Sequence, residues 1–209
     1  MTMTDVQPRG KARRIGVEAD ADFEGRRQIV LREAARAFGE KGVQATSLAE
    51  IASRLGVSKP ALYHYVSNKN EVISEVLKMA AAAVERIVSE ADEYGETGLQ
   101  KVSFAVREII RGASEPFARC ITAIDVNMLD DDTQDFHRKS QRKLVHGVSR
   151  MIEEGIEDGS IRECEPEIMS FAILGCANNT SRWYRDGGKL SLGAVSEQYL
   201  GLLTKGISA

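Results

Sequence analysis

The sequence contains few of the residues that mark several common classes of protein. Only three of its 209 residues are cysteines, Cys120, Cys164 and Cys176, and their spacing matches no metal-binding pattern. We therefore expect reduced thiols in a cytoplasmic protein, with no metal ion or other cofactor. Cys164 lies in a polar segment and is a candidate redox sensor, although an unreactive exposed thiol is the simpler interpretation.

Long apolar segments and common enzyme motifs are also missing. No stretch approaches the ~20 consecutive apolar residues that a membrane-spanning helix requires. The basic residues near the N-terminus are not followed by the apolar run of a secretory signal; they are Arg9, Lys11, Arg13 and Arg14. The sequence has neither a glycine-rich phosphate loop nor a nucleophile motif. These absences favour a globular protein that is neither a membrane protein nor an enzyme.

Charge is distributed unevenly along the chain. Residues 1–70 carry 12 Lys and Arg against 8 Asp and Glu, and residues 71–209 carry 16 against 23. The two parts therefore have net charges of +4 and −7, which make up the total of −3. A basic N-terminal part suits a polyanionic partner, and an acidic remainder would be held away from it.

The stretch from Ser47 to Tyr65 predicts two short helices joined by a tight turn. Ser47 and Glu50 have the spacing of a capping box for a helix that begins at Leu48, and Thr46 is a second candidate cap. One apolar face follows at helical spacing, formed by Leu48, Ile51, Ala52 and Leu55.

The turn and the second helix have equally clear signals. Gly56 can take the left-handed conformation that ends a helix, and we expect Val57 to fill the corner. Ser58 is placed to cap a second helix with Pro60 in its first turn. Leu62 would then face the first helix.

The outward side of this second helix carries hydrogen-bond donors and aromatic rings, mainly Lys59, Tyr63 and His64. An ordinary helical hairpin in a hydrophobic core is the alternative, but a solvated face would show an acidic mixture instead. Short residues at the helix start, followed by donors, suit close contact with DNA phosphates and base edges. We therefore interpret the stretch as a helix-turn-helix.

Residues 29–77 resemble the DNA-binding domain of the TetR family of bacterial transcriptional repressors. Two departures, Val66 and Asn70, replace the usual phenylalanine and acidic residue. The residues that carry the resemblance are Ala34, Ala35, Phe38, Gly42, Thr46, Ile51, Ala52, Gly56, Val57, Ser58, Leu62, Tyr63, His64, Tyr65, Ser67 and Lys69.

The resemblance and the pattern together predict the residues that contact DNA. The amides of Thr46 and Ser47 can point at a phosphate from a helix start, and in the family a lysine at the position of Lys69 binds phosphate. The full predicted set is Thr46, Ser47, Ser58, Lys59, Pro60, Ala61, Tyr63, His64, Tyr65 and Lys69.

Helical periodicity continues to the C-terminus, and no strand pattern occurs. The predicted fold is all-α, with nine helices in a TetR-like architecture. We expect three parts, which are a disordered basic arm at 1–22, a helix-turn-helix domain at 23–68 and a helical effector-binding and dimerisation domain at 69–209. The arm either touches DNA or is a solvated tail. The expected helices cover residues 22–40, 47–55, 59–65, 69–91, 99–113, 116–129, 133–158, 165–187 and 191 onward.

Two groups of polar residues in the predicted 69–209 domain could form binding sites, but each has a simpler explanation. The acidic run Asp130 to Asp132 points its carboxylates in different directions, which favours a helix cap over a metal site. The polar residues from Asn178 to Tyr184 lie at the end of an apolar helix and either bond across a subunit interface, which we favour, or orient a ligand. The candidate ligand-contacting residues are Phe104, Met128, Phe171, Asn178 and Trp183. Each of them could also belong to the hydrophobic core.

The resemblance implies a homodimer that binds a palindromic operator in double-stranded DNA and a small molecule that lowers DNA affinity. Segments within residues 152–192 are similar to a branch of the family that controls lipid, sterol or aromatic-acid catabolism and responds to acyl-CoA thioesters. We therefore predict a ligand-responsive repressor.

Two alternative functions differ from this prediction. An activating or architectural DNA-binding protein without a ligand would show little preference for one sequence. An enzyme would need its histidines as acid and base, but His64 falls on the predicted DNA-contacting helix. His137 and His146 lie nine positions apart on one helix, on faces that lean apart.

Overall fold

The computed structural model describes residues 10–207, with the side chains of residues 22–127 and 129–206. This part of the chain forms nine α-helices and two 3₁₀ turns without a β-strand, which confirms the predicted all-α fold. In chain order the elements are α1 (Gly10–Lys41), α2 (Leu48–Arg54), α3 (Lys59–Tyr63), α4 (Lys69–Tyr94), α5 (Gly98–Arg111), η1 (Gly112–Ser114), α6 (Pro116–Ala123), η2 (Val126–Met128), α7 (Asp131–Glu157), α8 (Pro166–Trp183) and α9 (Leu192–Ile207).

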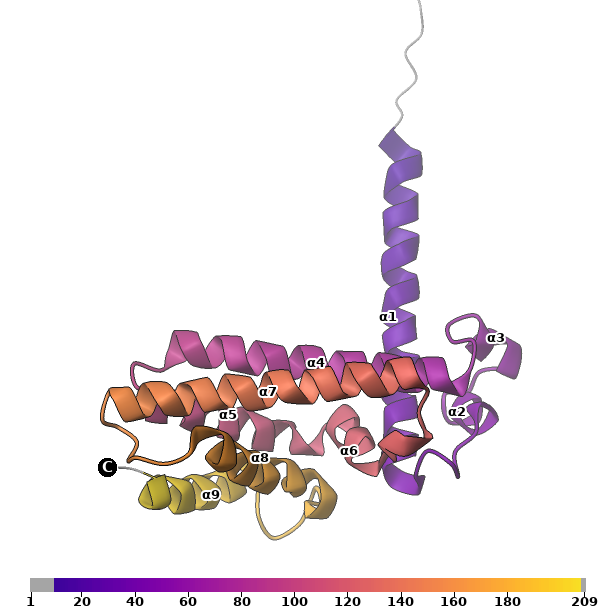
Figure 1. Cartoon of the computed structure of the whole chain (residues 1–209). Coiled ribbons are helices and arrows are strands. Elements are labelled where there is room, and N and C mark those ends of the chain that lie inside the picture. The colour runs from indigo at the N-terminus through magenta and orange to yellow at the C-terminus, as the bar shows by residue number, and fades with distance from the viewer. Residues whose placement is uncertain (1–9, 208–209) are drawn as a thin grey trace, which may run out of the picture.

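The helices form an elongated body with a small head at one end (Figure 1). We call α1–α3 the head and α4–α9 the body. The two long helices α4 and α7 lie side by side, α5 packs against both, and α8 and α9 complete the body. The α9 helix ends at the end of the body that lies far from α2 and α3 (Figure 1).

Two hydrophobic clusters hold the molecule together, and α4 contributes to both. The head cluster contains Phe38, Ile51 and Leu62, each fully buried, together with Val72 and Val76 from α4. It also includes residues of α6, among them the buried Cys120, whose pKa burial raises to about 12. The body cluster takes in the later part of α4, including the buried Ala91. The division between the clusters therefore lies within α4 rather than at its start.

Several predicted helix starts are confirmed, whereas the sixth and eighth helices end earlier than predicted, at Ala123 and Trp183. Ser58 and Asn68 accept hydrogen bonds from the backbone amides of Ala61 and Glu71, at 3.3 and 2.9 Å, and so cap α3 and α4. The carboxylate of Asp130 caps α7 by accepting from Thr133 N at 2.9 Å, as expected for the acidic run.

The start of α1 differs from the prediction. The expected disordered arm at 1–22 would have left the first helix to begin at Asp22, but α1 begins at Gly10. No proline follows Pro8 before α2, and Gly16 and Gly25 weaken a helix without ending it, so the helix can extend toward the N-terminus once it has formed. The apolar periodicity fades before Ile29, which is why it marked the buried part of the helix rather than its full length. Residues 1–9 lie outside the described part of the chain.

The start of α5 is held closely against the end of α7. A Cβ atom at Gly98 would overlap the backbone of Met151 and Gly155, so only glycine allows this approach. The backbone amide of Gly98 donates to the Asp158 carboxylate at 2.7 Å, and the amide of Leu99 donates to the Ser160 hydroxyl at 3.2 Å. These contacts fix the position of α5 within the body. No helix in the described part of the chain has the length and apolar character that crossing a membrane requires.

Candidate DNA-binding interface

The head holds α2 and α3 in a helix-turn-helix arrangement. Ser47 accepts from the amide of Glu50 at 3.2 Å and caps α2, and Gly56 ends the helix with a positive φ of 67°. Leu62, from α3, is fully buried in the same cluster as Ile51 from α2. The outward side of α3 is therefore fixed by packing on its inward side.

Two details of the turn correct the sequence-based expectation. Glu50 does not complete a capping box; its carboxylate instead pairs with Lys41 at 2.5 Å and Arg54 at 3.2 Å, and the ammonium of Lys41 is the main cause of its lowered pKa. Val57 does not fill the corner, because its side chain is 43% exposed. Its backbone amide, which donates to Ala52 O at 3.0 Å, fixes the turn.

Most of the predicted DNA-contacting residues lie on the surface of the head. Tyr63 is 44% exposed, and the ammonium of Lys59 lies 5.8 Å from the centroid of its ring. The other exposed members of the set are Ser47, Ser58, Lys59, Pro60, Ala61 and His64. The structure thus brings together, around one short helix, donors and small residues that can approach a DNA groove.

Aromatic contacts connect α1 to the end of α3, and the sequence analysis missed them. The ring centroid of Phe23 lies 5.5 Å from that of His64 and 5.2 Å from that of Tyr65, and His64 and Tyr65 lie 5.3 Å apart. Pairs at such distances typically stabilise a contact by about 0.5–1.5 kcal/mol beyond burial. The contact joins residues about forty positions apart, which no local pattern reveals. It positions both His64 and Tyr65.

Lys69 begins α4 beside the head. Its ammonium lies 6.0 Å from the centroid of the Phe38 ring, and desolvation lowers its pKa. No ion pair to Lys69 is formed by the residues whose side chains are described, whereas the neighbouring Glu71 binds Arg27 and the amide of Ser67. A partly buried cation with no carboxylate partner at this end of the molecule suits a phosphate.

The predicted ligand-contacting residues do not form one site. Phe104 packs on Tyr94 with ring centroids 4.8 Å apart, beside a surface groove in the body. Phe171 and Trp183 are 57% and 43% exposed on α8, and Asn178 is exposed there too. The side chain of Met128 lies outside the described residues. The described members of this set therefore do not line one cavity, and their contact with a ligand stays a prediction.

Two hollows that the sequence analysis did not identify are present, one in the body and one where the head meets the body. One, of about 600 Å³, lies between the end of α4, α5 and the last turn of α9. The other, of about 310 Å³, lies where the α1–α2 turn meets the start of α4 and the end of α6, and Lys41, Lys69 and Asp125 help to line it. Both combine residues far apart in the chain, so periodicity alone could not have located them.

Comparison with known families agrees with this geometry. The family model described as "Bacterial regulatory proteins, tetR family" matches residues 30–76, and the one described as "Tetracyclin repressor-like, C-terminal domain" matches residues 95–207. The chain belongs to the TetR family. The match over residues 30–76 includes α2 and α3, so the head contains the helix-turn-helix of a TetR-family transcriptional regulator, as predicted.

Relatives of known sequence and structure extend over most of this TetR-family chain. The HTH-type transcriptional repressor KstR2 of Mycolicibacterium smegmatis is 29% identical over 195 residues, which cover 88% of this chain and 91% of the relative. The structure of the ketosteroid transcriptional regulator KstR2 of Mycobacterium tuberculosis has the same fold, with a TM-score of 0.82 at 21% identity, covering 88% of this chain and 95% of that chain.

A further solved structure, described as AibR in complex with isovaleryl coenzyme A and operator DNA, has a TM-score of 0.74 at 21% identity and covers 86% of this chain and 98% of that chain. The relatives are named as transcriptional regulators, which confirms the prediction of a regulator rather than an enzyme.

Thr46 has a different place in this TetR-family head from the one predicted. It is only 2% exposed, its hydroxyl donates to Gly42 O at 2.9 Å and Ala37 O at 3.3 Å, and its amide donates to Val43 O at 3.3 Å. Hydroxyl and amide are both committed to the turn between α1 and α2. The structure therefore removes Thr46 from the exposed surface of the head and gives it a supporting role.

Replacing Thr46→Val should lower the free energy of unfolding by about 1–2 kcal/mol, because two carbonyl groups lose a buried donor. Operator affinity of the folded protein should change less than about twofold. Urea unfolding and fluorescence anisotropy with labelled DNA measure the two quantities. Ser53→Ala, at an exposed position of α2, is the control and should alter stability by less than about 0.5 kcal/mol. An unchanged unfolding midpoint combined with weaker DNA binding would show that Thr46 contacts DNA.

Proposed function

We propose that this TetR-family regulator is a homodimeric repressor that leaves a palindromic operator when a small-molecule effector binds its body. The observation that carries the DNA-binding part is the exposed face of α3, where Lys59, Tyr63 and His64 surround a helix anchored by the buried Leu62. In this proposal α3 enters the major groove, and Ser47, Ser58 and Lys69 bind the flanking phosphates.

The proposed dimer forms through the outer faces of α8 and α9. Ile168 and Phe171 on α8 are 68% and 57% exposed, and Leu202 on α9 is 70% exposed. Gly175 has open space where a side chain would be, so a second helix can approach closely there. Apolar side chains on the outside of two adjacent helices support a self-complementary contact, and two heads would then meet successive major grooves about 34–36 Å apart.

The proposed effector is an acyl-CoA thioester or a related lipid or aromatic catabolite. Support comes from the sequence resemblance of residues 152–192 and from two fold neighbours, one described as a ketosteroid regulator and one as bound to isovaleryl coenzyme A. The effector would stabilise a body conformation whose heads have the wrong spacing for the operator, and so shift the population away from DNA binding.

Replacing Tyr63→Ala should weaken operator binding about tenfold or more, because the side chain is exposed at the centre of the proposed contact face. The dimer should remain intact by analytical ultracentrifugation, and binding is measured by fluorescence anisotropy. Tyr94→Ala is a matched control. Tyr94 is also an exposed tyrosine, at 65%, but it lies at the C-terminal end of α4, far from α3. Equal operator affinity for the wild type and Tyr63→Ala would contradict the contact.

Replacing Lys69→Gln should weaken binding to operator and random DNA by similar factors and make the plot of log affinity against log salt shallower by about one. The measurement is a salt titration with both duplexes. Lys78→Gln is the control, because Lys78 lies on the same helix and already pairs with Glu75 at 2.9 Å. A loss of affinity confined to one base position would rule out the phosphate role.

Footprinting of DNA upstream of the protein's own gene should reveal one protected palindrome, and an effective acyl-CoA thioester should abolish that protection. Isovaleryl-CoA and longer aliphatic and aromatic thioesters are the compounds to test, with free coenzyme A as the control. Protection without sequence preference would instead indicate an architectural DNA-binding protein. Protection of a palindrome that no thioester relieves would remove the effector class from the proposal.

A further inference from the structure

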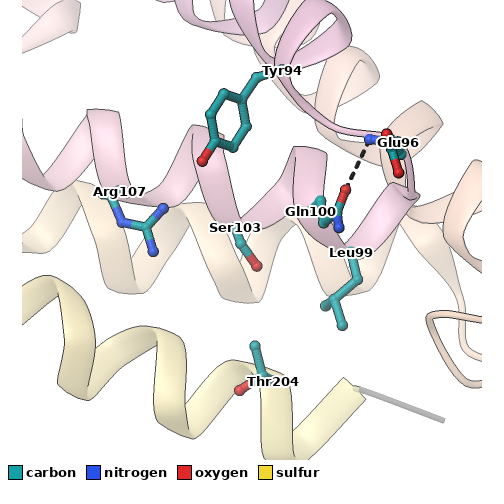
Figure 2. A pocket seen from close by; sticks show the side chains of 7 residues that line it. All are labelled: Tyr94, Glu96, Leu99, Gln100, Ser103, Arg107 and Thr204. Carbon is teal, nitrogen blue, oxygen red and sulfur yellow. Dashed lines mark hydrogen bonds between the residues drawn. The ribbon is translucent and has the colours of Figure 1, made fainter.

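The groove of about 600 Å³ lies at the end of the body that is far from α2 and α3. Figure 2 shows Leu99, Ser103 and Arg107 along α5, with Tyr94 reaching in from the end of α4 and Thr204 facing them from α9. The remaining lining residues are Glu96 and Gln100. The groove is open to solvent and large enough for a small organic molecule.

The α5 side of the groove changes in character along its length. Leu99, Ser103 and Arg107 follow one another at intervals of four residues, so they form one row on the helix surface. The row is apolar at one end, carries a hydroxyl in the middle and ends in a guanidinium. With a rise of ~1.5 Å per residue, the two ends are about 12 Å apart.

An aromatic surface lies beside this row. Tyr94 is 65% exposed, and its ring packs against that of Phe104 with centroids 4.8 Å apart and an angle of 32° between the ring planes. The contact holds the tyrosine ring in place while leaving much of it free. A flat or apolar group that covers this ring would remove exposed aromatic surface from water.

The guanidinium of Arg107 is the cationic group among the residues that line this groove, and its ion pair is long. Its nearest carboxylate oxygen, on Glu197, lies 3.6 Å away, beyond a normal hydrogen bond, and the Glu197 side chain is 69% exposed. By contrast, Arg111 on the same helix binds Glu108 at 2.6 Å, and Lys101 binds Glu154 at 2.6 Å. The Arg107 side chain is 30% exposed and lines the groove. A guanidinium in this state favours a carboxylate or phosphate that can approach more closely.

Of the two polar residues at the apolar end, Glu96 and Gln100, the amide side chain of Gln100 already binds the backbone. The Gln100 side-chain oxygen accepts from the backbone amides of Glu96 at 2.9 Å and Thr97 at 3.4 Å, where it closes the capping box of α5 (Figure 2). An anionic group therefore has its favourable place beside Arg107 and Ser103, and an apolar group has its place beside Leu99 and Tyr94.

The proposed dimer leaves the groove open. Leu202, on the face of α9 assigned to the dimer, lies two residues before Thr204, and successive residues are ~100° apart around a helix. Leu202 and Thr204 thus point about 200° apart, while Glu197 and Thr204 point in nearly the same direction. A second copy that covers Leu202 would not cover the groove.

We propose that this groove binds a small molecule with an apolar, preferably aromatic, body and one anionic group, carboxylate or phosphate. The anion displaces Glu197 from Arg107, and the apolar body covers Tyr94 and Leu99. The proposal concerns ligand binding in the body and does not depend on DNA binding or on a thioester effector.

Isothermal titration calorimetry of the full chain tests the proposal with three probes of one shape. They are 4-phenylbutyrate, 4-phenylbutyl phosphate and the neutral 4-phenylbutan-1-ol. Both anions should bind at least about tenfold more tightly than the alcohol, and the tighter anion identifies the preferred group. Similar affinities for all three probes, or no heat from any of them at millimolar concentration, would overturn the proposal.

Variants locate the site in the groove. Arg107→Gln should weaken binding of the anions about tenfold or more while leaving the alcohol unchanged, because only the anions bind the guanidinium. Glu197→Gln should tighten binding of the anions severalfold by removing the competing carboxylate. Arg111→Gln removes a paired arginine from the same helix and is the matched control. It should change the affinity for neither the anions nor the alcohol.

Circular dichroism checks that each variant is folded. If Arg107→Gln fails to fold, the Glu197→Gln variant tests the proposal by itself. An affinity for the anions that does not increase in Glu197→Gln would contradict the displacement of Glu197 from Arg107. Operator binding without any probe is measured on the same protein, so a failure of the proposed repressor function would be seen separately from a failure of the groove.

Discussion

The α4 helix belongs to both hydrophobic clusters, and this shared membership connects the head to the body. Val72 and Val76 are fully buried in the head cluster, and Ala91, four turns further along, is fully buried in the body cluster. Because packed interiors resist continuous deformation, a displacement of the later part of α4 cannot be absorbed locally. The α6 helix reinforces the connection, since Cys120 is buried in the head cluster although α6 belongs to the body. The position of α3 therefore depends on how the body packs.

The elements that could be predicted from the sequence are those specified by neighbouring residues. The caps at Ser58 and Asp130, the left-handed Gly56 and the buried Leu62 each follow from a few adjacent positions, and the structure has all of them. The extent of α1 was missed because apolar spacing reports burial rather than helicity. The burial of Thr46 was missed for a related reason, since a threonine that caps a helix and one that supports a turn from inside have the same local sequence.

The parts of the site that could not be predicted involve contacts between distant segments. Phe23 reaches His64 and Tyr65 across some forty residues, and the groove combines α4, α5 and α9. Composition selected Phe171 and Trp183 as pocket walls because large aromatic residues usually line cavities. The exposure of Phe171 on α8 gives it a different proposed role, in the contact between two copies. Sequence thus identified side chains that must be covered without showing what covers them.

The two ends of α4 have different roles in the proposals, phosphate binding at the first end and ligand binding at the second. Lys69 begins the helix where the phosphate is proposed to bind, and Tyr94 ends it at the groove. The 26 residues from Lys69 to Tyr94 span ~39 Å at the usual helical rise. A ligand that covers Tyr94 would contact the C-terminal end of α4, and the N-terminal end of the same helix packs against Phe38 and the head cluster. Since the acidic body has no electrostatic attraction to DNA, such a ligand would have to act mechanically, through the position of α4, rather than by competing for phosphate contacts.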